Sequence, residues 1–194
     1  MADAPRLAID AMGGDEGLAV MLRGVALARR RWPGLTFDLV GDEKAISAAL
    51  ENHPNLKANS QIIHAPEVIS GNDKAAQAIR KAKTTSMGIA IDRVKQGLAG
   101  AAVSAGNTGA LMSMAKLSLR TMPGIDRPAL AALLPSLGQT DFVMLDLGAN
   151  TECAARNLVE FGVMGAAYAR IALGIERPRV SLLNIGTEDL KGTD

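Results

Sequence analysis

Glycine-rich turns follow short apolar runs at four places in the 194-residue chain, and this repeated design constrains the fold more than any other feature. In each case the apolar run ends in a small polar residue, and glycine comes soon afterwards. An apolar run of this length predicts a strand that is buried on both faces. Glycine after the strand permits a sharp turn and a close approach to a ligand. The four segments are residues 7–15, 101–109, 142–150 and 180–186.

Helical and strand patterns alternate along the chain, which predicts a three-layer α/β/α fold with a mostly parallel, Rossmann-like sheet. Parallel strands would bring the polar ends of the four segments to one edge, where such folds bind ligands. No internal repeat or linker is visible, so we expect a single domain over residues 1–194. The predicted strands are Arg6–Asp10, Thr36–Val40, Gln61–His64, Ala101–Ser104, Ala129–Leu134, Asp141–Asp146 and Arg179–Asn184. The predicted helices are Gly17–Arg31, Glu43–Asn52, Lys74–Lys83 (capped by Asp73), Ser86–Gln96, Thr108–Leu119 and Ala154–Leu173.

Composition excludes several classes of protein. The chain has 21 basic and 20 acidic residues, and a net charge of +1 gives no overall attraction to nucleic acid or anionic lipid. Aromatic residues make up 3% of the chain, too few for the stacking platforms that bind single-stranded nucleic acid. The single cysteine, Cys153, excludes an intrachain disulfide and is typical of a reducing compartment. No signal peptide or membrane-spanning run is visible, which predicts a cytoplasmic protein.

Three consecutive arginines, Arg29 to Arg31, close the first predicted helix. Positive charge suits the negative C-terminus of a helix, and this is the interpretation that we favour. A nucleic-acid-binding patch is the alternative.

The segment Ser104–Gly109 places glycines between a predicted strand and a predicted helix. Unpaired N–H groups at a helix start, together with the helix dipole, bind anions, and Gly106 leaves room for a phosphate. Ser104, Asn107 and Thr108 can add hydrogen bonds. The alternative is that Asn107 or Thr108 only caps the helix. The chain contains neither the P-loop pattern nor the G-x-G-x-x-G dinucleotide fingerprint.

Polar side chains frame the other glycine turns. Asp10 and Asp15 flank the first turn, and Asp146 and Asn150 flank the third. Such carboxylates most often hold a loop by accepting from its N–H groups, although they can also contact ligand hydroxyls or Mg²⁺. Lys191, in the last loop, is a candidate cation for a phosphate or a developing oxyanion, or is simply solvated.

The chain shows no paired side-chain nucleophile. Cys153 has no histidine beside it in the sequence, and we interpret it as a packing residue. His53 and His64 belong to no recognisable triad or metal-binding spacing. A reaction whose nucleophile comes with the substrate needs no such pair.

Eight stretches, spread in one order over nearly the whole chain, resemble a known family. They are Ile9–Asp15, Thr85–Met87, Val103–Met112, Gly124–Ala129, Leu145–Asn150, Gly174–Arg179, Leu182–Gly186 and Lys191–Gly192. The family is that of the phosphate acyltransferases of bacterial phospholipid synthesis, the PlsX family.

This resemblance implies transfer of a long-chain acyl group from acyl carrier protein to inorganic phosphate, which yields acyl phosphate. It also implies a fold similar to phosphotransacetylase, a homodimer and peripheral membrane association, with no cofactor, no metal and no nucleic acid. Family chains continue further, so we expect these 194 residues to be part of a longer protein and inactive alone.

The loop analysis and the resemblance together select the candidate site residues. The catalytic candidates are Lys191, Asn184 and Asp146. The candidates for binding phosphate or substrate are Asp10, Gly13, Gly14, Asp15, Ser104, Gly106, Asn107, Thr108, Gly109, Asn150 and Gly186.

Three other functions stay open at this point. One is a phosphotransacetylase-like enzyme that uses acetyl-CoA. Another is a non-catalytic module that binds phosphate and a carrier protein. A dehydrogenase of similar topology is disfavoured because the dinucleotide fingerprint is absent.

Overall fold

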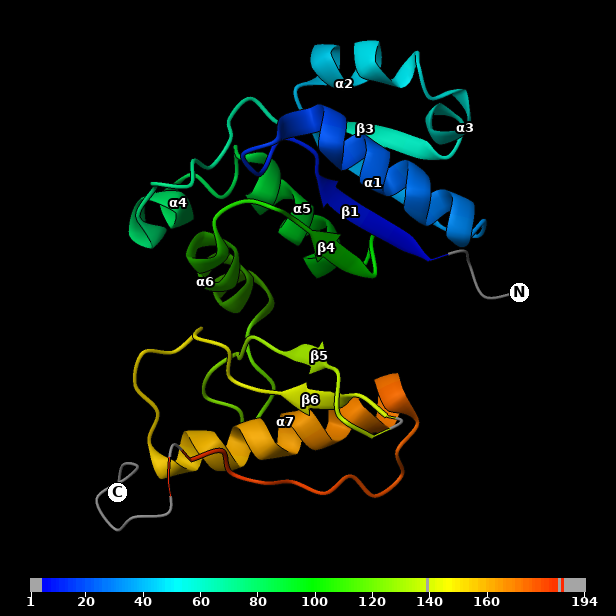
Figure 1. Cartoon of the computed structure of the whole chain (residues 1–194). Coiled ribbons are helices and arrows are strands. Elements are labelled where there is room, and N and C mark those ends of the chain that lie inside the picture. Colours follow the sequence, from blue (N-terminus) through cyan, green and yellow to red (C-terminus); the bar gives the residue numbers. More distant parts are fainter. Residues whose placement is uncertain (1–4, 139, 185, 187–194) are drawn as a thin grey trace. The chain divides into compact units, whose positions relative to one another are not determined.

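The computed structural model describes residues 5–138, 140–184 and 186, which fall into two compact units divided after Arg120 (Figure 1). The strands of the first unit are β1 (Arg6–Asp10), β2 (Thr36–Gly41), β3 (Ser60–His64) and β4 (Ala101–Val103). Its helices are α1 (Gly17–Arg31), α2 (Glu43–Leu50), α3 (Pro54–Lys57), α4 (Ala75–Arg80), α5 (Ser86–Lys95) and α6 (Thr108–Leu119).

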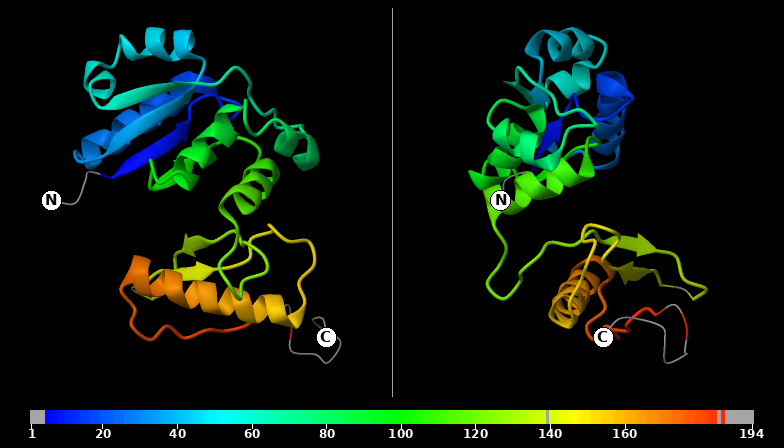
Figure 2. Two further views of the ribbon diagram at one scale, coloured as in Figure 1. Left: turned by 180° about the vertical axis from the view of Figure 1, so that it is seen from behind. Right: turned by 90° about the vertical axis from the view of Figure 1, so that its left-hand side faces the viewer.

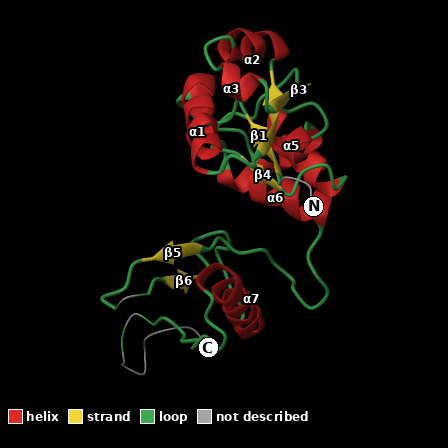
Figure 3. Ribbon diagram, turned by 90° about the vertical axis from the view of Figure 1, so that its right-hand side faces the viewer, coloured by secondary structure: helices red, strands yellow, loops and turns green. Residues whose placement is uncertain are grey.

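The sheet of the first unit is parallel throughout, with the strand order β3-β2-β1-β4. The helix α1 covers one face of this sheet and α5 covers the other (Figure 3). The predicted three-layer α/β/α arrangement is therefore confirmed. In the register of the central strands, Ile9 pairs with Leu39 on one side and with Val103 on the other. The next residue of each chain segment, Asp10 and Ser104, therefore emerges at the same edge.

Alternation of side chains along β1 builds a core on each face of the sheet. Ile9 and Leu39 pack with Leu22 of α1 in one buried cluster. Ala8, one residue earlier, packs with Ala90 of α5 in another. This pattern follows from the two-residue period of a strand. It confirms that β1 is the buried strand that its apolar run predicts. The strand β2, which was predicted only as a strand, is buried as well.

The strand β4 differs from that expectation. It is only three residues long, and Val103 is 42% exposed. The prediction that residues 101–104 are buried on both faces is wrong, because β4 pairs on one side only, with β1, and lies at an edge of the described sheet.

The second unit contains β5 (Ala132–Leu134), β6 (Phe142–Met144) and α7 (Ala155–Leu173). The two strands are antiparallel, with Leu133 opposite Val143. The helix α7 packs along β6 (Figure 2). It ends at Gly174, which has a φ of 67° and so adopts the left-handed conformation that glycine tolerates.

Two of the four glycine-turn segments depart from the predicted parallel sheet. The strand β6 returns beside β5 after a short connection, and a short connection joins antiparallel strands only, because parallel strands need a crossover. Residues 179–184 form no strand, since no described strand pairs with them. Val180, Leu182 and Leu183 in this segment are exposed. The parallel arrangement is confirmed for β1 and β4 and is wrong for these two segments.

Most predicted helices are present, with small shifts at their ends. The short helix α3 was not predicted, and α4 begins at Ala75 with Lys74 as its N-cap. The prediction that Asp73 caps this helix is wrong. Its Oδ2 accepts instead from the N–H of Ser70 at 2.9 Å. None of the described helices is both long and apolar enough to cross a membrane.

A buried ionic network ties the sheet to α5. Asp38 on β2 is fully buried, and its Oδ1 accepts from Arg6 Nη1 of β1 at 3.1 Å. Its Oδ2 accepts from Arg93 Nε of α5 at 2.8 Å. A buried charge is tolerated only when it is paired and hydrogen-bonded. The network therefore fixes how α5 lies on the sheet.

Replacement of this carboxylate should destabilise the first unit strongly. We expect Asp38→Ala to lower the free energy of unfolding by about 3 kcal/mol or more, because both arginines lose their partner. Urea unfolding followed by circular dichroism measures the change. The control is Glu51→Ala, which removes the exposed pair with Lys57 and should cost less than about 1 kcal/mol. Equal losses in the two variants would contradict the role assigned to Asp38.

Candidate functional site

A buried carboxylate organises the loops at the carboxyl edge of the first sheet. Asp10, the last residue of β1, is 1% exposed. Its Oδ1 accepts from the N–H of Gly13 at 3.0 Å, and its Oδ2 accepts from Ser104 Oγ at 2.7 Å. Ser104 Oγ in turn accepts from the N–H of Gly106 at 3.1 Å. One network therefore joins the turn after β1 to the turn after β4.

Glycine is required at two positions of this network. A side chain on Gly13 would collide with the carboxylate of Asp10. Gly14 has a φ of +95°, and a Cβ there would lie 3.1 Å from the carbonyl oxygen of Ala105. The two loops are thus in contact through their backbones. The sharp turns are present, and the close approach to a ligand stays a prediction.

Asn107 caps α6 and also binds a third loop. Its Oδ1 accepts from the N–H of Ala110 at 2.9 Å, as the capping interpretation predicts. Its Nδ2 donates to the carbonyl oxygens of Gly71 at 2.8 Å and Asp73 at 3.2 Å. This contact cannot be predicted from the sequence, because the loop is 34 or more residues away in the chain and no motif links the two.

The first turn of α6 offers free main-chain donors. Thr108 and Gly109 are exposed, and the first N–H groups of a helix have no acceptor within it. These donors begin two residues after Gly106, the last member of the Asp10–Ser104 network, where α6 starts (the position of α6 is shown in Figure 1). They suit an anion chemically.

Asp15 behaves differently from Asp10. It is exposed, and it makes no hydrogen bond with the described part of the chain. The N-cap of α1 is Glu16, whose side chain does not cap the helix either. Of the two carboxylates around the first glycine turn, only Asp10 holds the loop.

The second unit contains a similar carboxylate clamp. Asp146 Oδ1 accepts from the N–H groups of Leu130 at 2.8 Å and Ala149 at 3.2 Å. Its Oδ2 accepts from Asn150, from the backbone N–H at 2.8 Å and from Nδ2 at 3.1 Å. The same Nδ2 donates to the carbonyl oxygen of Pro128 at 2.9 Å. Asp146 and Asn150 thus hold their own turn against residues 128–130.

This clamp shifts the acidity of Asp146. Burial raises the pKa of the carboxyl group, but the donors from Leu130, Asn150 and Ala149 together outweigh burial. The pKa of Asp146 therefore lies below its ordinary value. The ionised form is the one that the fold stabilises.

A buried acid of α7 holds the loop around Asp126. Glu160 of α7 is 5% exposed, and it accepts from the N–H of Asp126 at 2.8 Å and from Arg156 Nε at 3.0 Å. Arg127 donates to the carbonyl oxygen of Glu152 at 2.9 Å. Glu160 is not predicted from the sequence, because no local pattern shows that an acidic residue on a helix will be buried.

Three candidates remain, all from the C-terminal part of the sequence. Asn184 is exposed and lies on the irregular segment after α7, and Gly186 is also among the described residues. Lys191 lies outside the described residues. The roles assigned to these three residues stay predictions. The structure joins Asp10, Gly13, Ser104 and Gly106 in one network, which does not include Asp15. In the second unit it clusters Asp146 with Asn150.

The histidines and the cysteine show no catalytic pairing. His64 accepts from the N–H of Glu43 at 3.4 Å, and Cys153 is a free thiol of intermediate exposure. Over residues 5–138, 140–184 and 186, no cluster of three or more His, Cys, Asp or Glu could hold a metal ion.

The depressed pKa of Asp146 predicts a pH-dependent stability. Its contribution should be present above the unfolded pKa of about 3.9 and be lost as the pH falls through the lower folded pKa. We expect Asp146→Asn to lower the free energy of unfolding by about 1 to 3 kcal/mol at pH 7 and by much less near pH 3. Urea unfolding at both pH values measures this. Asp141→Asn, at an exposed site in the same unit, should show no such trend. A pH-independent effect of Asp146→Asn would contradict the assignment.

Solved structures share this fold. A phosphotransacetylase from Streptococcus pyogenes matches with a TM-score of 0.64 at 22% identity, over 91% of this chain and 56% of its own. The EutD phosphotransacetylase from Staphylococcus aureus matches with a TM-score of 0.65 at 19% identity, over 95% of this chain and 59% of its own. These likenesses show an α/β fold of the phosphotransacetylase type.

Sequence relatives give a closer comparison. A phosphate acyltransferase from Erythrobacter litoralis is 65% identical over 190 residues, which cover 98% of this chain and 54% of the relative. A phosphate acyltransferase from Rhodospirillum rubrum is 49% identical over 194 residues, which cover 100% of this chain and 55% of the relative. The chain thus spans about half the length of these relatives. The family described as fatty acid synthesis protein matches residues 5–194. Since that match covers nearly the whole sequence, the chain belongs to the fatty acid synthesis protein family.

Proposed function

We propose that the protein to which this chain belongs is an enzyme that transfers a long-chain acyl group from acyl carrier protein to inorganic phosphate. The product is an acyl phosphate for phospholipid synthesis. The observation that carries the proposal is the network from Asp10 through Ser104 to Gly106, which fixes two glycine turns at one sheet edge. Relatives that are 65% and 49% identical and are named phosphate acyltransferase support it.

Inorganic phosphate binds, in this proposal, at the main-chain donors beside the network. Both oxygens of the Asp10 carboxylate already accept from groups of the two turns, so in this proposal Asp10 acts as scaffold. The N–H groups at the start of α6 and the hydroxyl of Thr108 then face the anion. Helix dipoles and unpaired N–H groups make such sites favourable for phosphate without a large positive charge.

The proposed reaction needs no side chain as nucleophile, because phosphate itself attacks. A phosphate oxygen attacks the thioester carbonyl carbon, and a C–O bond forms as the carbonyl oxygen becomes an oxyanion. The oxyanion then collapses, the C–S bond breaks, and the electron pair leaves on the carrier's thiolate. A thiol has an ordinary pKa of about 8.5, so this group departs with little acid assistance. The protein's task is therefore to position the phosphate and stabilise the oxyanion.

Further candidate groups come from the second half of the sequence, and the family resemblance alone assigns them. Asp146 and Asn150 hold their own turn, and Asn184, Gly186 and Lys191 follow later in the sequence. Lys191 is the cation proposed to neutralise charge on phosphate or on the oxyanion. Homodimer formation, a cytoplasmic location and peripheral membrane association are further parts of the proposal. They rest on the family resemblance.

Acetyl-CoA is the competing donor, because the fold is shared with two phosphotransacetylases. The deciding experiment compares long-chain acyl carrier protein with acetyl-CoA, using a polypeptide of full family length that carries this chain. Phosphate-dependent release of carrier thiol from the long-chain donor supports the proposal. Turnover of acetyl-CoA alone would favour the phosphotransacetylase reaction. Phosphate binding without turnover of either donor would indicate that the protein is a non-catalytic binding module.

The glycine turn after β1 should be essential. We expect Gly13→Ala to raise the KM for phosphate or lower kcat more than tenfold, because the added methyl group displaces the carboxylate of Asp10. Gly100→Ala is the control, since its added Cβ would meet only the carbonyl oxygen of Arg6 at 3.7 Å. Steady-state kinetics of both variants measures the difference. Normal kinetics in Gly13→Ala would remove this turn from the site.

Lys191 is tested in the same full-length polypeptide. We expect Lys191→Ala to lower turnover more than tenfold, the scale of a lost transition-state charge interaction. Lys116→Ala, at an exposed lysine in the last turn of α6, should retain normal turnover. Wild-type turnover of the Lys191 variant would exclude it from the mechanism.

A further inference from the structure

A basic groove in the first unit has no role in the site described above. It is an open hollow of about 830 Å³ between the outer side of α1 and residues 52–56. Arg23, Leu27 and Arg30 line it from α1, and His53 and Pro54 line it from the opposite wall. A second hollow, of about 630 Å³, adjoins the end of the same helix at Arg31 and Trp32.

The charge of the groove is unbalanced. No acidic residue lines it. Arg29 is already engaged, since Nη1 donates to the carbonyl oxygen of Leu35 at 2.9 Å and Nη2 to Asn59 Oδ1 at 2.8 Å. Arg23 and Arg30 are exposed and make no hydrogen bond or ion pair with the described residues. Guanidinium groups of this kind bind carboxylates in a fixed, often bidentate geometry.

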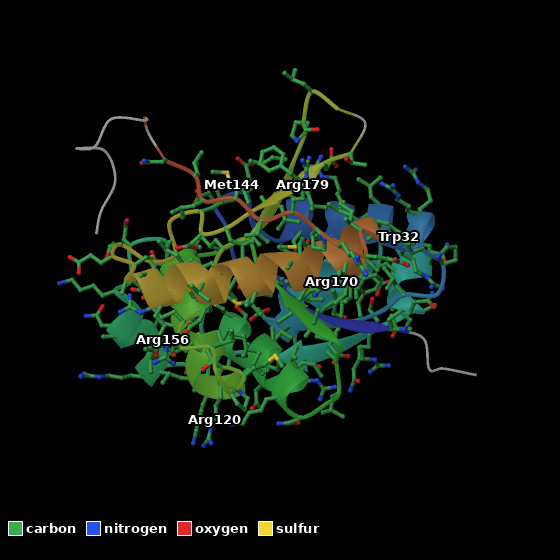
Figure 4. All side chains as sticks on the ribbon, turned by 90° about the horizontal axis from the view of Figure 1, so that it is seen from below. Trp32, Arg120, Met144, Arg156, Arg170 and Arg179 are labelled. Carbon is green, nitrogen blue, oxygen red and sulfur yellow. The ribbon has the colours of Figure 1, made fainter. Side chains whose placement is uncertain are left out.

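The groove also has an apolar centre. Arg23, Leu27 and Arg30 are separated by four and three residues, so they share one face of the helix. Leu27 is 55% exposed between the two arginines. Trp32, 53% exposed, lies beyond the end of α1 (Figure 4). The guanidinium carbon of Arg31 lies over its ring, 4.8 Å from the ring centre. Exposed Trp and Arg around an apolar side chain are typical of protein interfaces.

We propose that this groove docks the acidic carrier protein that delivers the acyl group. The inference rests on the proposed function for the identity of the partner and goes beyond it in locating the contact. Carboxylates of the partner pair with Arg23 and Arg30, and an apolar side chain between them packs on Leu27. A concave wall with an apolar centre fits a protein surface better than the flat headgroup layer of a membrane. Because the whole chain has a net charge of only +1, attraction to an acidic partner is confined to this groove.

The groove lies along the second half of α1, toward the end of the helix that is farther from the glycine turns. The helix α1 starts at Gly17, just after the turn held by Asp10. At 1.5 Å per residue, Arg23 lies about 9 Å along the helix from that start and Arg30 about 20 Å. A carrier docked there leaves its flexible prosthetic arm free to run along α1 to the phosphate.

Direct binding tests the proposal. Fluorescence anisotropy with labelled holo-acyl carrier protein compares the wild-type chain with Arg23→Glu/Arg30→Glu, and thermal unfolding checks that both are folded. We expect the double variant to weaken carrier binding at least tenfold and to lose most of its salt dependence. The matched control is Lys44→Glu/Lys95→Glu, an equal charge change at exposed sites on α2 and α5. This control should change the affinity less than twofold.

The milder double variant Arg23→Lys/Arg30→Lys keeps the charge and removes the planar forks of the guanidinium groups. It should bind with intermediate affinity. Equal losses in the glutamate variant and the control would overturn the proposal, because they would indicate only overall charge. Carrier binding that survives the glutamate change while binding to anionic phosphatidylglycerol vesicles or to DNA is lost would also overturn it.

Turnover separates this inference from the function on which it rests. In the full-length polypeptide, the glutamate variant should raise the KM for acyl carrier protein and leave the KM for phosphate unchanged. An unchanged KM for the carrier overturns the docking site while the proposed function stands. Absence of any turnover of acyl carrier protein by the wild type overturns the proposed function itself, and this inference with it.

Discussion

The carboxylate of Asp10 is the group on which the loops of the first unit depend. It is buried at the end of β1, and a buried charge persists only where hydrogen bonds compensate for the lost water. Both of its oxygens accept, one from the turn after β1 and the other from Ser104 after β4. The parallel pairing of these strands is what brings the two acceptors and donors together. Without the carboxylate, both turns would lose the hydrogen bond that ties them to the end of β1.

The same device recurs in the second unit. Asp146 accepts from three residues and holds its turn against residues 128–130, and these donors keep its pKa low. In both units, then, an aspartate close to the end of a strand accepts hydrogen bonds from nearby loops. Side chains in this arrangement serve as scaffold, and the backbone N–H groups that they position remain available. A reaction in which phosphate itself is the nucleophile suits a site of this kind, since it needs placement and charge stabilisation rather than a reactive side chain.

The helix α1 links the proposed chemistry to the proposed docking surface. Its inner face, with Leu22 and Val25, packs in the core against the sheet, and its start follows the turn that Asp10 holds. Its outer face carries the unpaired arginines Arg23 and Arg30. Because a helix is rigid over this length, a partner bound to the outer face is held at a defined distance from the turn. In the proposed arrangement, α1 therefore contributes to packing, to the geometry of the site and to recognition of the carrier.

The local pattern of the chain determined much of this architecture. An apolar run located β1, helical periodicity located α1, and the glycines after β1 and β4 marked sharp turns, the second of which leads into α6. Asn107 was recognisable as a helix cap because capping depends on residues only three apart. Tertiary structure alone decided the rest: that β5 and β6 run antiparallel, that residues 179–184 form no strand, and that Asp73 and Gly71 bind Asn107. It also decided that Asp10 is buried while Asp15 is exposed, and that Glu160 lies inside. The reason is physical, since the pairing of a strand or the burial of an acid depends on partners far away in the chain, and no local sequence pattern specifies which distant group will arrive.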